Sequence, residues 1–445
     1  MKKIISTLAL ATLAFGSVFA DVTFTTNYRT RMAGFSRVIN AQPNYSKDAY
    51  AEQHNSYLFA QRGYSDASDD FAIGVSNDFG GAFVKINPNL RTQVSNDDRV
   101  PGLNAYYGYV NFGALTLTAG FLDGRSNGAY RLTDYIGHNL EGQDAYGQLG
   151  SMHTNAVSFK ADDITWYDGK ERPVGILTYK GEFGDTVVTA DLVAAAVDAH
   201  ASSSDTTNEA TNAWDNSKIH AAFGARVDVK LPIADFQFVV KEQKNHSKAN
   251  PAVTKRSVAF SVAPNFGENM SLALSTSLGF YNGDLTDFNG DVRFVFKTGN
   301  IAFTSLNKIG YVTDTGVDSY NPLGYADHVG LCFVKNDGTL GWQKNAESQS
   351  SMWNVLGFSM ELSEKLTVFA NVGDIIGFNA GKKEIGDYGM ELFVVPGVQL
   401  FATKNCSITT ALRVGVNNPL MDKDTYDKIE PAYGILVPVV FRVQL

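Results

Sequence analysis

The sequence predicts an all-β fold, a transmembrane antiparallel barrel of about 18 strands (roughly 16–20), with short periplasmic turns and long extracellular loops. Three observations favour this fold. Apolar and polar residues alternate along many segments that are longer than ordinary globular strands. Short turns alternate with long polar connections along the chain. The alternation also continues to the last residue, Leu445, where a soluble domain would usually fray.

The first segment, residues 1–20, reads "MKKIISTLALATLAFGSVFA". Lys2 and Lys3 precede an apolar run that ends in small residues, which is the order of a cleaved secretory signal peptide. We therefore expect an exported protein whose mature part, residues 21–445, forms a single outer-membrane barrel domain. No linker and no change of composition divides this part of the sequence.

The charge balance disfavours nucleic acid as a partner. The chain carries 37 basic and 46 acidic residues, a net charge of -9, and loss of Lys2 and Lys3 leaves 35 against 46, or -11. The two cysteines, Cys332 and Cys406, are too few for a disulfide scaffold. The sequence leaves open whether they pair, and two small strand residues are the simpler interpretation.

The strands are predicted where one face is apolar and the other polar. In "KIHAAFGARVDVKL", residues 218–231, Phe223 and Val227 share one face, whereas Arg226 and Asp228 share the other. Residues 270–281, 291–297, 389–400 and 406–416 repeat this period of two. Tight turns are predicted between the strands at 77–81, 111–114, 182–185, 231–235, 265–269, 297–300 and 362–365.

The last strand, "YGILVPVVFRVQL", is apolar or aromatic at every odd position from Tyr433 to Leu445. Lipid cannot satisfy backbone hydrogen bonds, so a sheet in a membrane must close on itself and embed its final strand fully. An exported soluble β-sandwich binding protein is the alternative. Such a sandwich would expose its polar face to bulk water and would carry more charge there than the Ser, Thr, Gly and Ala found here.

One hairpin, residues 105–120 with the sequence "AYYGYVNFGALTLTAG", resembles the early hairpin of the Gram-negative general porins. The strand that begins at Asp21 is also similar to a porin first strand, and the last strand is similar to the signal that the barrel-assembly machinery recognises, with Leu445 in place of the terminal aromatic. The resemblance implies a homotrimer. The positions that match the hairpin are Ala105, Tyr106, Gly108, Phe112, Gly113, Leu115, Leu117 and Gly120.

The resemblance also implies that the loop after this hairpin, residues 122–153, folds into the channel and narrows it. In that family the loop's carboxylates face arginines on the wall. The Pro-Glu-Phe-Gly segment of the family is missing here. A solvated extracellular loop is the alternative. The charged candidates in the loop are Asp123, Arg125, Arg131, Asp134, Glu141 and Asp144.

The alternation of residues along each strand places a set of charged residues on the polar faces, where they would line the pore. Opposed charges across a narrow aqueous passage sort solutes by charge, and the excess of basic residues favours anions. For any one of these residues, the alternative is that its charge only keeps the pore wall hydrated and selects no solute. The candidates are Arg29, Arg31, Lys160, Arg226, Asp228, Lys230, Arg293, Glu391, Arg413 and Arg442.

Enzyme motifs lack their structural context. Residues 124–128 match G-x-S-x-G, but a nucleophile elbow requires an α/β sheet. The acidic segment 284–291 lacks the order of an EF-hand loop and is interpreted as a polar hairpin turn. We therefore expect no enzyme, no catalytic residue, no cofactor and no metal.

The predicted function is an outer-membrane porin that passes small hydrophilic solutes and ions by passive diffusion. The expected location is the outer membrane of a Gram-negative-type, diderm bacterium. The expected partners are outer-membrane lipid, the transported solutes and the assembly machinery. An outer-membrane adhesin or structural barrel protein is the alternative on the same fold.

Overall fold

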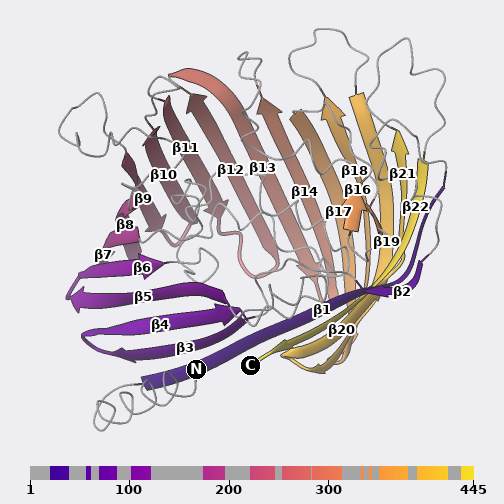
Figure 1. Cartoon of the computed structure of the whole chain (residues 1–445), viewed down its shortest axis with the longest axis horizontal. Helices are drawn as coiled ribbons and strands as arrows, with labels where there is room; N and C mark the ends of the chain where they lie inside the picture. Colours follow the sequence, from indigo (N-terminus) through magenta and orange to yellow (C-terminus); the bar gives the residue numbers. More distant parts are fainter. Residues whose placement is uncertain are drawn as a thin grey trace, which may run out of the picture.

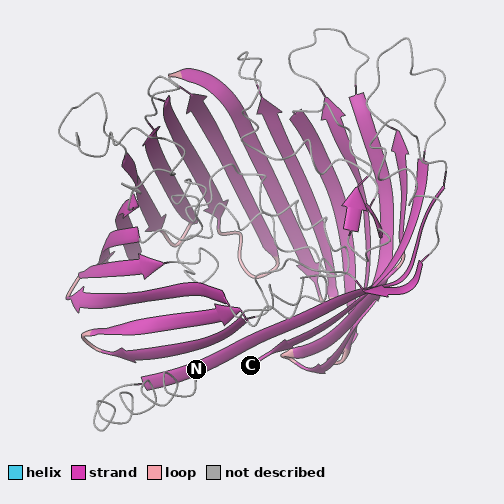
Figure 2. Ribbon diagram, viewed as in Figure 1, coloured by secondary structure: helices cyan, strands magenta, loops and turns pink. Residues whose placement is uncertain are grey.

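The computed structural model describes thirteen segments of the chain, and every regular element in them is a β-strand (Figure 2). Within these segments no helix is long and apolar enough to cross a membrane. The described residues are 21–39, 57–61, 70–87, 102–121, 174–195, 221–245, 253–281, 283–312, 332–334, 340–342, 350–378, 388–418 and 432–445.

The strands are labelled in Figure 1. They are β1 Asp21–Ile39, β2 Tyr57–Gln61, β3 Asp70–Asn77, β4 Gly80–Asn87, β5 Gly102–Phe112, β6 Leu115–Phe121, β7 Val174–Phe183, β8 Thr186–Ala195, β9 Ala221–Lys230, β10 Ala234–Asn245, β11 Val253–Pro264, β12 Met270–Tyr281, β13 Asp284–Thr298, β14 Ile301–Val312, β15 Cys332–Val334, β16 Leu340–Trp342, β17 Ser350–Ser363, β18 Leu366–Phe378, β19 Tyr388–Thr403, β20 Cys406–Ala411, β21 Arg413–Asn418 and β22 Ala432–Gln444.

The main sheet is a closed antiparallel barrel of 18 strand positions, which confirms the predicted fold class. It contains twenty strand segments, because two positions are each shared by two segments. β2 and β3 both pair with β1, and β20 and β21 both lie between β19 and β22. The ring closes where β1 pairs with β22. The short β15 and β16 form a separate two-stranded sheet.

The seam between the first and last strands also joins the chain ends. The amide N–H of Thr26 donates to the carbonyl of Leu445 at 2.7 Å, and that of Leu445 donates back to Thr26 at 2.9 Å. The apolar last strand is therefore paired to its end, as a strand in lipid must be. Cys406, at the start of β20, has a free thiol and is not bonded to Cys332.

Short turns lie at one end of the barrel, and Thr26 of β1 pairs with Leu445 at this same end. They join β3 to β4, β5 to β6, β7 to β8, β9 to β10, β11 to β12, β13 to β14, β17 to β18 and β19 to β20. All seven tight turns predicted from the sequence lie among them. A further predicted turn, at residues 284–291, is wrong. These residues are part of strand β13, which continues to Thr298. β12 ends at Tyr281 and β13 begins at Asp284, at the other end of the barrel.

Apolar side chains face outward and polar side chains face inward, which is the reverse of the arrangement in a soluble protein. Outward positions carry exposed large apolar residues, such as Leu192 on β8, which is 62% exposed. Inward positions carry buried polar residues, such as Arg226 and Arg413, each 2% exposed. This distribution suits a barrel wall in hydrocarbon, because charge on the lipid side is costly whereas polar groups inside can find partners. The chain is therefore an outer-membrane-type β-barrel.

Candidate functional site

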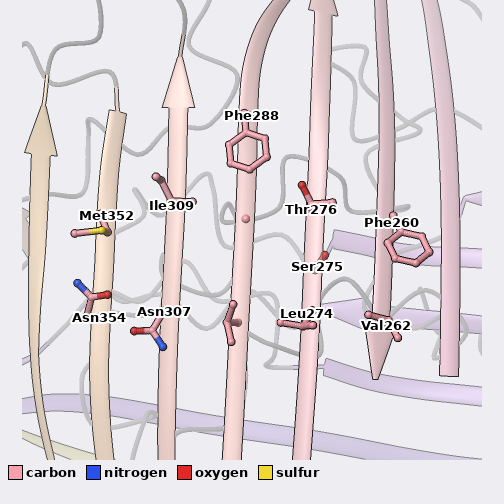
Figure 3. Close-up of a pocket in the computed structure, with 12 residues that line it drawn as sticks. Phe260, Val262, Leu274, Ser275, Thr276, Phe288, Asn307, Ile309, Met352 and Asn354 are labelled. Carbon is pink, nitrogen blue, oxygen red and sulfur yellow. The ribbon is translucent and has the colours of Figure 1, made fainter. Parts of the chain in front are cut away.

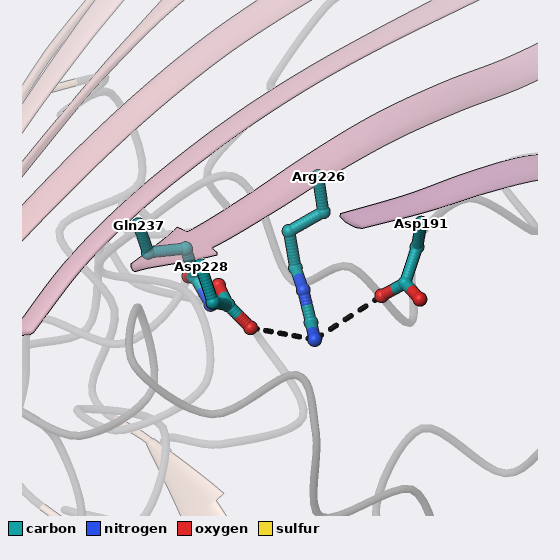
Figure 4. A network of polar contacts seen from close by, with 4 residues as sticks. All are labelled: Asp191, Arg226, Asp228 and Gln237. Atoms are coloured by element: carbon teal, nitrogen blue, oxygen red, sulfur yellow. Dashed lines mark hydrogen bonds and ion pairs between the residues drawn. The ribbon is translucent and has the colours of Figure 1, made fainter. Parts of the chain in front are cut away.

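An ion-pair network lies on the inner face of β8, β9 and β10 (Figure 4). The guanidinium nitrogen Nη2 of Arg226 lies 3.1 Å from Oδ2 of Asp191 and 2.6 Å from Oδ2 of Asp228. The amide Nε2 of Gln237 donates to Oδ1 of Asp228 at 2.8 Å. Two carboxylates thus share one guanidinium.

Strand register brings these four side chains together. Arg226 of β9 lies directly opposite Asp191 of β8, and Asp228 lies opposite Gln237 of β10. Arg226 and Asp228 are two residues apart on one strand, so they point to the same face. Cross-strand neighbours on one face have Cβ atoms about 5 Å apart, a distance that these side chains can bridge.

Burial makes the network strong but intolerant of change. The side chains of Arg226 and Asp191 are 2% and 3% exposed, and that of Asp228 is 16% exposed. In such an environment charge-assisted hydrogen bonds are strong, and removal of one partner leaves an uncompensated buried charge. The network therefore holds two carboxylates and one guanidinium in fixed positions at the inner wall.

Two further predicted arginines are buried on the inner face. Arg293 of β13 is 8% exposed and lies opposite Ala273 and Leu306. Arg413 begins β21, and its guanidinium carbon lies 5.7 Å from the ring centre of Phe393, which is a cation–π distance. Both arginines are on the predicted polar face but are buried by other parts of the protein.

The seam of the barrel carries the other basic positions. Arg442 of β22 is half-buried on the inner face, and its register partner on β1 is Arg29. Arg31 lies two residues further along β1, opposite Val440. For Arg29 and Arg31, these register partners describe the position of the backbone. The seam nevertheless places three arginine positions on neighbouring strands.

The remaining predicted candidates fall into two groups. Lys230 is exposed beside a short turn, with Asp235 as its register partner, and Glu391 occupies a register position opposite Ile375 and Asn417. The whole segment 122–153 lies outside the described residues. So do the individual candidates Lys160, Asp123, Arg125, Arg131, Asp134, Glu141 and Asp144.

Sequence analysis missed Asp191 and Gln237. Both lie at inward positions of strands whose alternation was visible, so parity could have placed them on the polar face. Parity alone could not pair them with Arg226 and Asp228, because pairing depends on register. Within the described segments, no group of three or more His, Cys, Asp and Glu side chains is placed to hold a metal ion.

The network and the basic seam lie on opposite sides of the ring. Counted from β1, with β2 and β3 as one position, β9 is the eighth of the 18 positions. Figure 1 shows β8 and β9 at the left of the barrel and β22 at the right. The network with its two carboxylates and the half-buried Arg442 thus lie on different parts of the inner wall.

The comparisons found similarity to solved outer-membrane barrels. The channel DcaP of Acinetobacter baumannii is 9% identical, with a TM-score of 0.44, over 96% of this chain and 98% of that one. Wzi of Escherichia coli, a carbohydrate-binding barrel involved in capsule assembly, is 12% identical, with a TM-score of 0.46, over 97% and 87%. OmpT of Vibrio cholerae is 8% identical, with a TM-score of 0.39, over 96% and 98%. No protein-family model and no curated protein sequence matches the chain.

These comparisons correct one prediction. The sequence analysis excluded an enzyme, but the similar structures are not channels alone, since OmpT of Vibrio cholerae, an outer-membrane protein, stands among them beside a channel and a carbohydrate-binding barrel. One fold supports unrelated activities. The exclusion of an enzyme is therefore wrong, and the barrel architecture leaves catalysis open.

Proposed function

We propose that this barrel is an outer-membrane porin, a channel through which small hydrophilic solutes or ions pass by passive diffusion. One observation carries the proposal: a closed ring of 18 strand positions has apolar side chains outside and charged side chains inside. A purely structural barrel requires the apolar exterior. It does not require ionic groups on two facing inner walls.

The asymmetry of the inner wall suggests how the channel would select solutes. Arg442 and the register positions of Arg29 and Arg31 face the wall that holds Asp191 and Asp228. A field between them would run across the passage and orient dipolar solutes. Anions carry the charge opposite to that of arginine, so we expect mobile anions to interact at the seam.

Planar-bilayer recording of the purified protein tests the proposal. Under a salt gradient we expect discrete conductance steps and a reversal potential that reports ion preference. The variant Arg442→Glu should shift that potential toward cation preference, and the shift should shrink as salt screens the wall charge. The matched control is Arg256→Glu, which alters an arginine on the outer side of β11 and should leave the potential unchanged.

The result that would overturn the proposal is a correctly folded barrel that stays electrically silent. Folding can be checked independently by the heat-dependent gel mobility that is typical of such barrels. A silent but folded protein would favour an adhesin or a structural barrel. If Arg442→Glu and Arg256→Glu shifted the reversal potential equally, the arginines of the seam would not determine the ion preference.

The proposal includes the biogenesis that the sequence suggests. Residues 1–20 would be removed as a signal peptide, and residues 21–445 would be inserted as one barrel domain by the assembly machinery. The place of the chain in the general porin family rests on the hairpin at 105–120. The same resemblance suggests a homotrimer, and a trimer form of OmpT from Vibrio cholerae is among the similar structures.

A further inference from the structure

Three aromatic side chains, which we call the aromatic platform, lie together on the inner face of β4 and β5: Phe83, Tyr107 and Tyr109. Phe83 and Tyr107 are register partners, and their ring centres are 5.3 Å apart at an interplanar angle of 31°. Tyr109 follows Tyr107 by two residues and therefore points to the same face. This face is the inner one, because the neighbouring Tyr106 and Val110 are 45% and 47% exposed on the outer face.

Glycines on adjacent strands let these rings lie along the wall. Gly81 of β4 is the register partner of Tyr109, and a Cβ atom at Gly81 would lie 2.8 Å from Cε1 and 2.7 Å from the hydroxyl oxygen of Tyr109. The ring of Tyr109 thus fills the space over Gly81. Gly74 of β3 is the register partner of Phe83, and a Cβ atom there would lie 3.6 Å from Cδ2 of Phe83. A ring that covers the backbone in this way turns its other face toward the interior of the barrel.

Neutral polar side chains border the platform on the same inner face. Thr118 of β6 is the register partner of Tyr109. The hydroxyl of Thr116 donates to Oδ1 of Asn111 at 3.0 Å, and Thr116 lies opposite Thr178 of β7. All four of these polar side chains are half-buried. Hydroxyl and amide groups therefore flank the rings.

The platform is half-buried and is not sealed into the wall. Each of its three rings keeps part of its surface accessible, whereas Ala105, two residues before Tyr107 on the same face, is 0% exposed. No protein group in the described part of the chain hydrogen-bonds to the hydroxyl of Tyr107 or Tyr109. Tyrosine hydroxyls away from bulk water usually have a partner, so these two hydroxyls are available to a solute.

We propose that the aromatic platform binds a neutral saccharide inside the barrel. A sugar ring carries C–H groups on its faces and hydroxyls around its rim. Stacking on an aromatic ring removes the C–H face from water, and the hydroxyls of tyrosine and threonine can both donate to and accept from the rim. The inference names a solute class for the proposed channel, and it rests on the proposed function only for the passage of the sugar.

The groove on the outer face of the barrel does not suit such a solute (Figure 3). It has a volume of about 520 Å³ and lies where Gly290 of β13 separates Phe288 from Val292, with Asn307 and Asn354 at one edge. The groove opens toward lipid, so a sugar would have to leave water to reach it. The inner platform carries no such cost.

Saturation-transfer NMR with maltotriose as the probe tests the site, with the purified barrel in a detergent that has no sugar headgroup. Irradiation of the protein should transfer magnetisation to the ring protons of maltotriose, and titration gives the dissociation constant. Tyr109→Ala should raise this constant about tenfold, the change expected when one aromatic stacking contact is lost. The matched control is Tyr106→Ala, the same substitution on the outer face of the same strand, which should leave binding unchanged.

Two further measurements decide the question even if Tyr109→Ala fails to fold, as judged by heat-dependent gel mobility. Tyr109→Phe keeps the ring and removes the hydroxyl, so it should raise the dissociation constant only about threefold, as expected for one neutral hydrogen bond. Sorbitol has the hydroxyls of glucose but no ring face. It should bind to the unaltered barrel about tenfold more weakly than glucose.

Several results would overturn the inference. A folded, unaltered barrel that transfers no magnetisation to maltotriose or glucose would do so. Equal losses from Tyr106→Ala and Tyr109→Ala, or equal binding of sorbitol and glucose, would also do so. Conductance in sugar-free salt tests the proposed function separately, since binding without conductance would retain the saccharide site and reject the porin.

Discussion

Two polar clusters of similar size lie on opposite faces of the same barrel wall. The inner cluster joins Asp191, Arg226 and Asp228 through two ion pairs within the protein wall. The outer cluster joins Asn354 of β17 to Asp374 of β18 through one hydrogen bond of 2.8 Å, and both residues lie on the outer face. Both rely on cross-strand register, yet only the inner cluster holds a cation to balance its carboxylates.

The difference teaches where a barrel can keep polar groups and at what free-energy cost. Inside, protein atoms bury the cluster, and deletion of one member leaves a stranded charge. Outside, hydrocarbon offers no partner, and deletion of the polar atoms removes a cost unless another protein chain supplies hydrogen bonds. Equivalent deletions on the two faces should therefore change the stability of the monomer in opposite directions.

The largest effect is expected for Arg226→Met. It should lower the free energy of unfolding by about 3–5 kcal/mol, because Asp191 and Asp228 would remain buried without their cation. Urea titration of the vesicle-embedded barrel, followed by heat-dependent gel mobility, measures the change.

The control for Arg226→Met is the triple variant that adds Asp191→Asn and Asp228→Asn. Removal of both carboxylates should restore most of the lost stability, since amides can hydrogen-bond without a cation. If the triple variant is as unstable as the single one, lost packing and not stranded charge explains the effect.

A smaller effect of opposite sign is expected for the monomer with Asn354→Leu and Asp374→Leu. In dilute detergent, where copies are separated, the free energy of unfolding should rise by about 1–2 kcal/mol, because polar groups leave the lipid-facing wall. The same urea titration measures it. A lower stability would mean that the bond between Asn354 and Asp374 supports the wall by itself, and the contrast between the two faces would fail.

The smallest effect is expected for Arg256→Ala. Arg256 pairs with Glu242 on the outer side of the barrel, but its side chain is 56% exposed. Exposed ion pairs contribute about 0–1 kcal/mol, so the urea midpoint should scarcely move. A loss comparable to that of Arg226→Met would show that burial does not separate the two arginines.

Several features of the fold followed from the sequence because period two is a local property. Alternation assigned Phe223 and Val227 to the outer face of β9 and Arg226 to the inner one, and their exposures agree. Short turns were recognisable from their residues. The segment before Asp70 was not, because whether β2 starts a new hairpin or shares the position of β3 depends on pairing with β1.

The candidate site was less accessible from the sequence. Arg226, Arg293 and Arg413 were identified by parity, but their burial was not, since it depends on what packs over the inner face. The sequence analysis did not single out Asn354 and Asp374, whose contact depends on the register between β17 and β18. The acidic segment 284–291 resembled a turn, yet its inward positions suit a polar interior, and it continues strand β13.

The sequence by itself determined that alternate side chains face different surroundings, and hence that the chain builds a membrane barrel, because two residues per period is a property of every extended strand. Only the tertiary structure decided which residues became neighbours. A slip of the register would move Asp191 away from Arg226 and Asn354 away from Asp374, and register is fixed by the closure of the whole ring at β1 and β22.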